Sequence, residues 1–369
     1  MPTVGESTSL AERKRRAGQR LVIGIAGKTV TSEVRELVRE LQPAGFILFS
    51  RNVGDPVQVR DLNRALAELL PSDRPPILSV DQEGGRVQRI RAPATVWPSM
   101  RTVGRARSFT YRVAEAQGKE LRAMGFNLNF APVADVDSNP DNPVIGDRSF
   151  GTSPLDVGVH VSTYIMGLQG TGMMACAKHF PGHGDTDVDS HLALPVVDRS
   201  LESLQQTELP PFRAAVQAGV ASIMTAHVVF PAIEKSWPST LTPEIQKGIL
   251  RDQIGFKRLL FTDDLEMKAV HERYALQDQV RRTYLGTVDL MLVCHTPSLQ
   301  LDFFAELVKQ QEQSREIEAL AVQSHGRLSE ARRIYLESAL PAPGLDVVGS
   351  SEHLELADEV EAAARRTLA

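Results

Sequence analysis

Eight short runs of apolar residues recur along the chain, and each is followed by polar or glycine-rich residues and then by a segment with helical periodicity. The runs occupy residues 21–27, 45–50, 76–81, 128–136, 173–180, 221–228, 258–264 and 288–294. Near-continuous apolar runs are typical of strands that are buried on both faces. They therefore predict a parallel sheet covered by helices.

The segments between these runs predict amphipathic helices. In VTSEVRELVRELQ, residues 30–42, four apolar side chains would share one face of a helix: Val34, Leu37, Val38 and Leu41. Residues 56–70 and 200–219 have a similar pattern, and each predicts one helix. A long polar helix is expected around 301–338.

Residues 340–351, LPAPGLDVVGSS, predict a linker, and a last helix should follow it. Its apolar residues recur near helical spacing: Leu354, Ala357, Val360, Ala364 and Leu368. This spacing favours packing on the outside of the main domain, with docking of a partner as the alternative.

Eight strands that alternate with helices favour a (β/α)₈ TIM barrel, an α/β fold, over an open doubly wound sheet. A doubly wound sheet usually carries a glycine-rich phosphate loop after its first strand. Here the first strand leads into IAGKTV, residues 25–30, which contains no G-x-G-x-x-G. We predict a catalytic barrel over residues 1–340, and a linker with a C-terminal helix over 341–369.

The composition narrows the range of partners. The chain has 369 residues, of which 42% are hydrophobic and 24% charged, as in ordinary soluble domains. A net charge of −5 disfavours nucleic acid or an anionic membrane as the main partner. No window holds ~18 uninterrupted apolar residues, and residues 1–20 lack the apolar stretch of a secretory signal. We expect a cytoplasmic monomer.

The two cysteines, Cys176 and Cys294, lie far apart inside apolar runs. This placement predicts reduced core residues and not a disulfide framework.

Chemically reactive side chains fall at the ends of successive predicted strands. Such ends carry Asp81, Asp135, Lys178, His179, His227, Asp263 and Asp264. Because the carboxyl ends of parallel barrel strands meet at one mouth, these side chains should converge on one site. His227 could belong to that site or be a buried strand-end histidine that is bonded within the barrel.

The stretch AKHFPGHGDTDVDSHLALP, residues 177–195, concentrates three histidines and three aspartates in its central part. Pro181, Gly182 and Gly184 disfavour a helix that would hold a metal between histidines. The aspartates resemble the start of an EF-hand, but Ser190 and Val196 replace the glycine and glutamate that such a loop requires. A zinc site made of three histidines remains open: His179, His183 and His191.

Proton transfer is the other chemistry that this stretch could support. An aspartate that binds one nitrogen of an imidazole raises the basicity of the other nitrogen, and Asp189 is two residues from His191. Alternatively, Asp189 caps a turn above a packed His191. The glycine-rich loop after a barrel strand favours the functional alternative.

The sequence TDD, residues 262–264, supplies a candidate nucleophile at a strand end. Only one of Asp263 and Asp264 should face the mouth, since neighbouring strand side chains point to opposite faces. An ionised carboxylate there could attack an anomeric carbon. The alternative is that both aspartates cap the next helix.

Several motifs together resemble glycoside hydrolase family 3, in its bacterial β-N-acetylglucosaminidase branch. KHFPGHG, four residues and then DSH span Lys178 to His191. VDQEGGRVQR (80–89), NFAPVADV (129–136), NPVIGDRSFG (142–151), MTAHVVFP (224–231) and TDDLEM (262–267) follow the family in the same order. The resemblance covers roughly residues 15–335.

The resemblance implies a retaining mechanism without metal or cofactor. Asp263 would be the nucleophile and His191 the general acid/base, oriented by Asp189. Sugar binding would fall to Asp81, Arg89, Arg148, Lys178 and His179. For Arg148, the alternative is an ion pair with Asp147 or with the nucleophile.

The turn between Asp81 and Arg89 contains Glu83, which we interpret as a turn acid and to which we assign no role in the mechanism. The glycines of this turn, Gly84 and Gly85, would let the backbone approach a ligand.

By resemblance, the chain would remove terminal β-linked N-acetylglucosamine from anhydro-muropeptides during peptidoglycan recycling. Its partner would be a small carbohydrate or muropeptide, with neither nucleic acid nor membrane involved. Most glycosidases use a second carboxylate where this chain would use histidine. A neutral histidine base should tolerate an anionic acceptor such as phosphate better than a carboxylate does, so a phosphorylase remains an alternative. A β-glucosidase, a sugar-binding regulator on a degenerate scaffold and a metal-dependent hydrolase also remain open.

Overall fold

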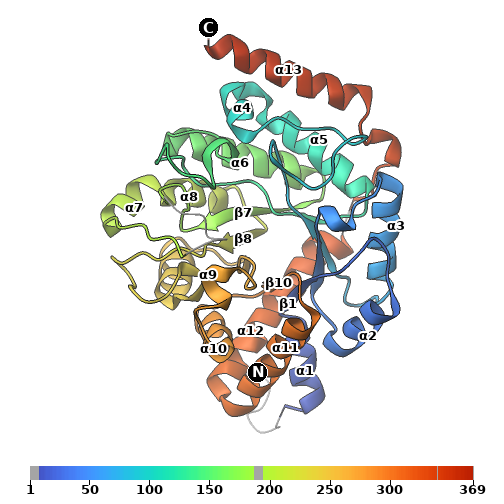
Figure 1. Cartoon of the computed structure of the whole chain (residues 1–369), viewed down its shortest axis with the longest axis vertical. Helices are drawn as coiled ribbons and strands as arrows, with labels where there is room; N and C mark the ends of the chain where they lie inside the picture. The colour runs from blue at the N-terminus through green and yellow to red at the C-terminus, as the bar shows by residue number, and fades with distance from the viewer. Residues whose placement is uncertain (1–7, 187–193, 339, 369) are drawn as a thin grey trace.

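The computed structural model describes residues 8–186, 194–338 and 340–368. Within these ranges, eight parallel strands form one sheet in the order β10-β1-β2-β3-β6-β7-β8-β9 (Figure 1). Their bounds are β1 Leu21–Gly24, β2 Gly45–Leu48, β3 Ile77–Val80, β6 Leu128–Asn129, β7 Met174–Phe180, β8 Ser222–Thr225, β9 Leu259–Phe261 and β10 Met291–Val293. A parallel bridge between Phe261 and Leu290 joins the two ends of the sheet. The predicted (β/α)₈ barrel is confirmed.

The strands are apolar throughout because both of their faces are covered. In β1, Val22 belongs to the cluster inside the barrel, whereas Leu21 and Ile23 belong to the cluster between the sheet and the helices. In β2, Ile47 points inward and Phe46 points outward. This alternation follows from the two-residue period of a strand.

Helices follow the strands and form the outer layer. They include α2 (Ser32–Leu41), α3 (Pro56–Ala67), α5 (Thr110–Ala123), α6 (Pro154–Gly170), a π-helix (Glu244–Gln253) and α10 (Leu276–Leu285). In α2, Val34, Val38 and Leu41 are buried as predicted, and the Thr31 side chain caps the helix by accepting from the N–H of Val34. In the described part of the chain, no helix is both long and apolar enough to cross a membrane.

Two predicted helices are each divided in the structure. Residues 200–219 form α7 (Leu201–Thr207) and α8 (Leu209–Gln217), with prolines in the first turn of α8. Residues 301–338 fall into α11 (Pro297–Gln313), α12 (Arg315–Arg332) and a short π-helix (Arg333–Glu337). Ser314 separates α11 from α12 and caps α12 by accepting from the N–H of Ile317. The predictions of one continuous helix were wrong because the amphipathic pattern continues across each break.

The C-terminal helix α13 (Ser351–Leu368) packs across α4 (Met100–Arg105) and α5 on the outside of the barrel (Figure 1). Ala357, Val360 and Ala364 are buried as predicted, but Leu354 is exposed, and Leu356 is buried in its place. The packing alternative is therefore the one that the structure supports.

Candidate active site

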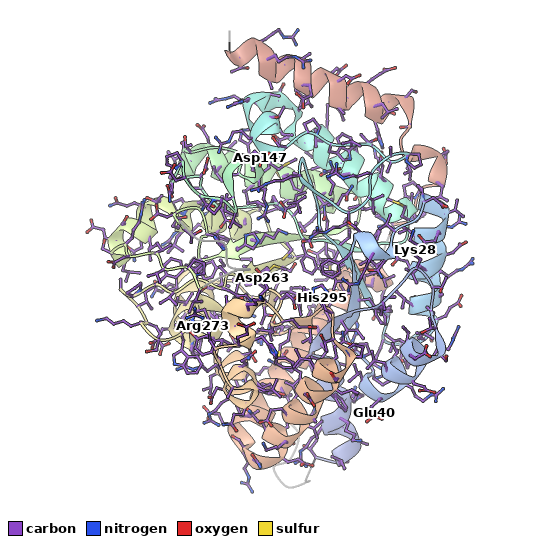
Figure 2. All side chains as sticks on the ribbon, in the orientation of Figure 1. Lys28, Glu40, Asp147, Asp263, Arg273 and His295 are labelled. Atoms are coloured by element: carbon purple, nitrogen blue, oxygen red, sulfur yellow. The ribbon has the colours of Figure 1, made fainter. Side chains whose placement is uncertain are left out.

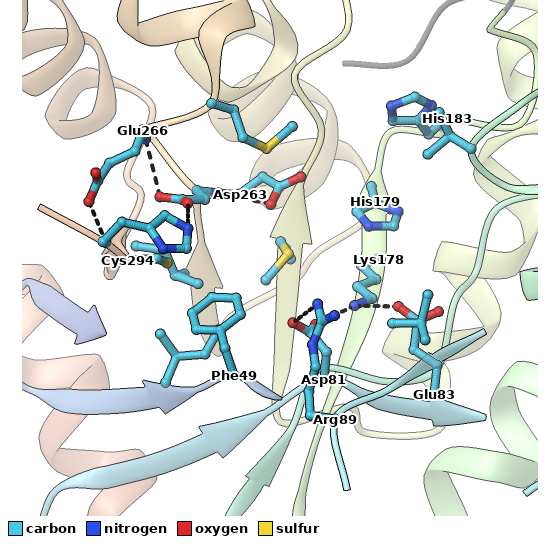
Figure 3. Close-up of a pocket in the computed structure, with 18 of the residues that line it drawn as sticks. Phe49, Asp81, Glu83, Arg89, Lys178, His179, His183, Asp263, Glu266 and Cys294 are labelled. Carbon is cyan, nitrogen blue, oxygen red and sulfur yellow. Dashed lines mark hydrogen bonds and ion pairs between the residues drawn. The ribbon is translucent and has the colours of Figure 1, made fainter. Parts of the chain in front are cut away.

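A cavity of about 480 Å³ lies at the carboxyl ends of the barrel strands. It contains six of the predicted site residues: Asp81, Arg89, Arg148, Lys178, His179 and Asp263. Figure 2 shows Asp263 near the middle of the molecule, and Figure 3 shows the cavity itself. Asp189 and His191 lie outside the described residues, so their predicted roles are not tested by this geometry.

One wall of the cavity is a compact group of charges. The Nζ of Lys178 lies 2.8 Å from Oδ1 of Asp81 and 2.7 Å from Oε1 of Glu83, and Nη2 of Arg89 lies 3.2 Å from Oδ2 of Asp81 (Figure 3). Burial opposes the charge on Lys178, but Asp81 and then Glu83 outweigh it and raise the pKa of the ammonium group. Burial likewise opposes ionisation of Asp81, but Lys178 and Arg89 keep its pKa below the usual value. Both partners are therefore charged and held in place.

Glu83 is the partner of Arg148, which corrects the alternative considered from the sequence. The guanidinium donates from Nε to Oε2 and from Nη2 to Oε1, both at 2.8 Å. Although burial acts against ionisation, Arg148 and Lys178 hold the pKa of Glu83 far below its usual range. Asp147 instead pairs with Arg86 at 3.1 Å, and both of these side chains are about half exposed.

The sequence prediction gave Glu83 no role, yet a usable signal was present. Glu83 follows the strand-end Asp81 by two residues, which places both side chains on the same face of an extended segment. Both carboxylates thereby reach the ammonium group of Lys178.

A tight hairpin carries Glu83 and leads to Arg89. It consists of β4 (Gln82–Gly84) and β5 (Val87–Gln88), and Gly84 and Gly85 have φ values of 112° and 58°. A Cβ on Gly84 would lie 2.5 Å from the carbonyl oxygen of Pro98. The glycines are thus required by the turn and by a neighbouring backbone segment, and their predicted role in ligand approach stays a prediction.

Asp135 lies behind the cavity and binds two histidines that line it. Its Oδ2 lies 2.7 Å from Nδ1 of His179, and its Oδ1 accepts from the backbone N–H of His183 at 2.8 Å. Because a carboxylate accepts, Nδ1 of His179 carries the proton, and the ring lines the cavity. The register between β7 and β8 shifts between Ala177 and Phe180, so Lys178 and His179 can both reach the site.

His183 serves the structure of the turn that follows β7. Its Nδ1 lies 2.8 Å from the hydroxyl oxygen of Thr186, and burial lowers its pKa to about 4, which leaves the ring neutral. Among the described residues, no group of three or more His, Cys, Asp or Glu side chains could hold a metal. The zinc hypothesis also needs His191, which lies outside those residues, and it stays untested.

Asp263 and Asp264 both line the cavity, in contrast to the expectation that only one would do so. The reason is that β9 ends at Phe261 and the chain then turns. The carboxylate of Asp264 accepts from the N–H of Glu266 at 3.1 Å and lies 3.2 Å from Nε2 of His295. Asp264 thus stabilises the turn, while the carboxylate of Asp263 remains for the cavity.

Asp263 is ionised in this environment. Burial would raise its pKa, but His227, His179, the backbone N–H of Asp264 and Lys178 outweigh that effect and lower the pKa. The N–H of Asp264 donates to Oδ1 of Asp263 at 2.8 Å.

The opposite wall contains two residues that the sequence prediction missed, Phe49 and Glu266 (Figure 3), and the missed His295 also lines the cavity. Nη1 of Arg51 lies 2.9 Å from Nδ1 of His295, and a guanidinium only donates, so the ring proton is on Nε2 and faces Asp264. Oε1 of Glu266 accepts from the N–H groups of His295 and Thr296. Phe49 lies near the end of the second predicted strand, and His295 follows the eighth, so the strand-end rule could have found them.

The cysteines are placed as predicted. Cys176 and Cys294 are buried and free of disulfide bonds, and burial raises the pKa of both thiols.

This arrangement suits a small polyhydroxylated ligand. Carboxylates accept hydrogen bonds from hydroxyl groups, and the ammonium and guanidinium groups donate to their oxygens. An ionised carboxylate beside such groups can also form a bond to an electrophilic carbon.

The chain has clear relatives among known proteins. Residues 14–325 match the family described as "Glycosyl hydrolase family 3 N terminal domain". A beta-hexosaminidase of Stenotrophomonas maltophilia is 36% identical over 283 residues, which are 74% of this chain and 83% of the relative. A beta-hexosaminidase of Thiobacillus denitrificans is 37% identical over 295 residues, covering 78% of this chain and 81% of the relative.

Solved structures extend the similarity to the fold. A family 3 β-N-acetylglucosaminidase from Paenibacillus sp. str. FPU-7 superimposes with a TM-score of 0.89 at 36% identity, covering 97% of this chain and 69% of that one. NagZ from Neisseria gonorrhoeae gives a TM-score of 0.76 at 32% identity and covers 94% of this chain and 97% of that one. From the length of the match and these identities, the chain belongs to glycosyl hydrolase family 3 and is a glycoside hydrolase.

Proposed function

We propose that this chain is a retaining exo-β-N-acetylglucosaminidase that releases terminal β-linked N-acetylglucosamine. The observation that carries the proposal is the ionised Asp263 in a small cavity lined by paired, fixed charges that suit hydroxyl groups. A cavity of about 480 Å³ suits one or two sugar rings better than a long polysaccharide. The names of the relatives, beta-hexosaminidase and β-N-acetylglucosaminidase, support the choice of sugar.

In the proposed mechanism, Asp263 and His191 act in two steps. A carboxylate oxygen of Asp263 bonds to the anomeric carbon as the bond to the leaving oxygen breaks, and His191 gives that oxygen a proton. In the second step His191 takes a proton from water, the water oxygen bonds to the anomeric carbon, and the bond to Asp263 breaks. The configuration at that carbon is retained.

Two of the described histidines of the cavity have other tasks, which supports His191 as the acid/base. His183 is neutral and buried. His179 forms with Asp135 the same carboxylate–imidazole pair that we propose for Asp189 and His191, and we assign it to sugar binding from the family motifs. Both ring nitrogens of His295 are bound, one by Arg51 and one by Asp264.

The finer proposal is that the substrate is an anhydro-muropeptide and that the reaction belongs to peptidoglycan recycling in the cytoplasm. It rests on the family motifs. Rates on N-acetylglucosaminyl-anhydro-N-acetylmuramic acid, with and without its peptide, compared with rates on chitobiose, test it. Equal or higher rates on chitobiose would contradict it.

A 2-acylamido fluorosugar tests the nucleophile directly. Incubation should trap a covalent adduct, and peptide mapping should find it on Asp263. Asp263→Ala should lose at least about a thousandfold in kcat on an aryl N-acetyl-β-glucosaminide, ~4 kcal/mol in the barrier, while still binding N-acetylglucosamine. Activity within about tenfold of the wild type, ~1.4 kcal/mol, would contradict the assignment.

The acid/base assignment is tested by comparing His191→Ala with Glu266→Gln on substrates that have poor or good leaving groups. His191→Ala should slow substrates with poor leaving groups far more than activated aryl glycosides, because the latter need little protonation. Glu266→Gln should affect both substrate types alike. The reverse pattern would make Glu266 the acid, the two-carboxylate arrangement of most glycosidases.

Phosphate distinguishes a hydrolase from a phosphorylase of the same family. The hydrolase proposal expects free N-acetylglucosamine and a rate that does not depend on phosphate. A sugar 1-phosphate product would overturn it. An aryl β-glucoside cleaved as fast as the N-acetylglucosaminide would favour a β-glucosidase.

A further inference from the structure

His227 is fully buried at the end of β8, and the proposed mechanism does not use it. It does not line the cavity. Its ring nevertheless reaches the turn that carries the nucleophile: Nε2 lies 2.9 Å from the carbonyl oxygen of Asp264. On its other side, Nδ1 lies 2.8 Å from the hydroxyl oxygen of Thr240.

These partners determine where the ring proton lies. A carbonyl oxygen only accepts, so Nε2 must carry the hydrogen. The hydroxyl of Thr240 then donates to Nδ1 and can itself accept from Thr225, whose Oγ1 is 2.9 Å away. The Thr240 hydroxyl also lies 2.8 Å from the carbonyl oxygen of Ala226, which is its alternative acceptor. Because that carbonyl already accepts from the N–H of Thr240 and from Ser239, we assign the hydroxyl proton to Nδ1.

The ring is neutral. Burial, the main influence, lowers the pKa of His227 below its usual value. At neutral pH the ring is uncharged and acts through the position of its N–H group. Its charge helps to lower the pKa of Asp263 only at the acid pH where His227 is protonated.

The residue that His227 holds is joined directly to the nucleophile. The N–H of Asp264 donates to Oδ1 of Asp263 at 2.8 Å, and the carbonyl of Asp264 accepts from His227. The next N–H, of Leu265, donates to the carbonyl of Leu292 at 3.0 Å. The turn is therefore tied to β8 through one histidine and to the neighbouring β10 through the backbone.

We infer that His227 is a positioning residue for the nucleophile: its Nε2–H group holds the Asp264 carbonyl and thereby fixes the direction of the Asp263 carboxylate. The inference rests on the proposed function, in which that carboxylate attacks the anomeric carbon. A displacement of 1 Å at a reacting group can lower a rate by about a hundredfold, so a single second-layer hydrogen bond can matter for kcat.

Two amide replacements separate the role of the Nε2–H group from that of simple packing. In His227→Gln, the side-chain amide nitrogen can occupy the place of Nε2 and donate to Asp264. In His227→Asn, the shorter amide reaches only the place of Nδ1 and meets Thr240. Both variants retain a polar, uncharged side chain at the same site.

The measurement is kcat and KM on an aryl N-acetyl-β-glucosaminide, with the dissociation constant of N-acetylglucosamine and the unfolding free energy measured in parallel. His227→Gln should keep kcat within about tenfold of the wild type, and His227→Asn should lose about a hundredfold. Sugar binding should change by less than about threefold in both, since His227 does not touch the cavity.

Equal kcat values in the two variants, or a loss that appears only in KM, would overturn the inference. If neither variant folds, Thr240→Val decides: removal of the hydroxyl frees Nδ1, and kcat should fall by about tenfold with KM unchanged. An unchanged kcat in Thr240→Val would overturn the inference. A wild-type protein without glycosidase activity would overturn the proposed function as well. If the wild type is active and the two His227 variants have equal kcat values, only the role of His227 is overturned.

Discussion

Glu208 lies between α7 and α8, and its replacement by glutamine should stabilise the protein at alkaline pH. The carboxyl group is buried, Oε1 is 3.4 Å from the hydroxyl of Ser138, and Oε2 has no hydrogen-bond partner among the described residues. Burial first, and then the carboxylates of Asp135 and Asp185, raise the pKa of Glu208 from 4.5 to about 8. Arg199 opposes this rise but does not cancel it.

The sign of the effect follows from proton binding. Below pH 4.5 Glu208 is protonated in both the folded and the unfolded chain and contributes nothing to pH dependence. Between 4.5 and about 8 the unfolded chain releases the proton while the folded chain keeps it, so stability falls as pH rises. At about 1.4 kcal/mol per pKa unit, the full effect is at most about 5 kcal/mol. Local rearrangement that admits water would make it smaller.

Glutamine resembles the protonated acid and cannot ionise, so the variant should lose this pH dependence. Urea unfolding followed by tryptophan fluorescence measures the free energy of unfolding of both proteins. Between about pH 5 and about pH 8.5, the stability of Glu208→Gln relative to wild type should increase by up to ~4 kcal/mol.

The exposed Glu202 of α7 provides a control, because Glu202→Gln should leave the pH dependence of wild type unchanged. Parallel pH profiles for Glu208→Gln and wild type would refute the reasoning. Such a result would mean that Glu208 is already ionised at neutral pH, with a counter-charge close enough to compensate for its burial.

Three further outcomes are expected. Arg148→Ala removes the two-bonded guanidinium partner of the buried Glu83 and leaves Lys178 as its counter-charge, so it should lower the free energy of unfolding by about 3 kcal/mol in urea titration. Asp147→Asn, in a half-exposed pair, should change the free energy of unfolding by less than about 1 kcal/mol. Gly184→Ala would place a Cβ 1.6 Å from the carbonyl oxygen of Val136 and should reduce both stability and activity, whereas Gly248→Ala, with nothing within 4 Å, should leave activity unchanged. Dialysis against a chelator should not change the hydrolysis rate; a loss that added zinc restores would contradict the metal-free mechanism.

The barrel could be predicted because its physical requirement is visible in the sequence. Each strand is covered on both faces and therefore consists almost entirely of apolar residues, and eight such runs alternate with helical segments. Helix boundaries were harder, since the amphipathic pattern continues through Glu208 and through Ser314. Local signals existed at both places: Pro210 and Pro211 fit the first turn of a new helix, and Ser314 is a typical N-cap.

The cavity residues were predictable for a related reason, because the carboxyl ends of parallel strands must meet. Which of these side chains form ion pairs with one another could not be predicted. Whether Arg148 bonds to Asp147 or to Glu83 depends on how two loops far apart in the chain approach each other, and periodicity carries no information about that distance. Sequence proximity favoured Asp147, but an exposed neighbour gains little from an ion pair, whereas the buried Glu83 requires a cation.

The same reasoning explains why the second layer of the site is the part that the sequence conceals most. Asp135 and His227 do not line the cavity, and Glu83 lines it while it is paired with Arg148 and Lys178; each satisfies a polar group that the barrel has buried. A buried polar atom without a partner is costly, so the fold must supply one from wherever the chain happens to pass. Asp135 comes from the segment after β6, His227 from the segment after β8, and Glu83 from the hairpin after β3. The cavity side chains are therefore held by contacts between strand ends, and under the proposed mechanism substitutions in that layer should alter kcat before they alter sugar binding.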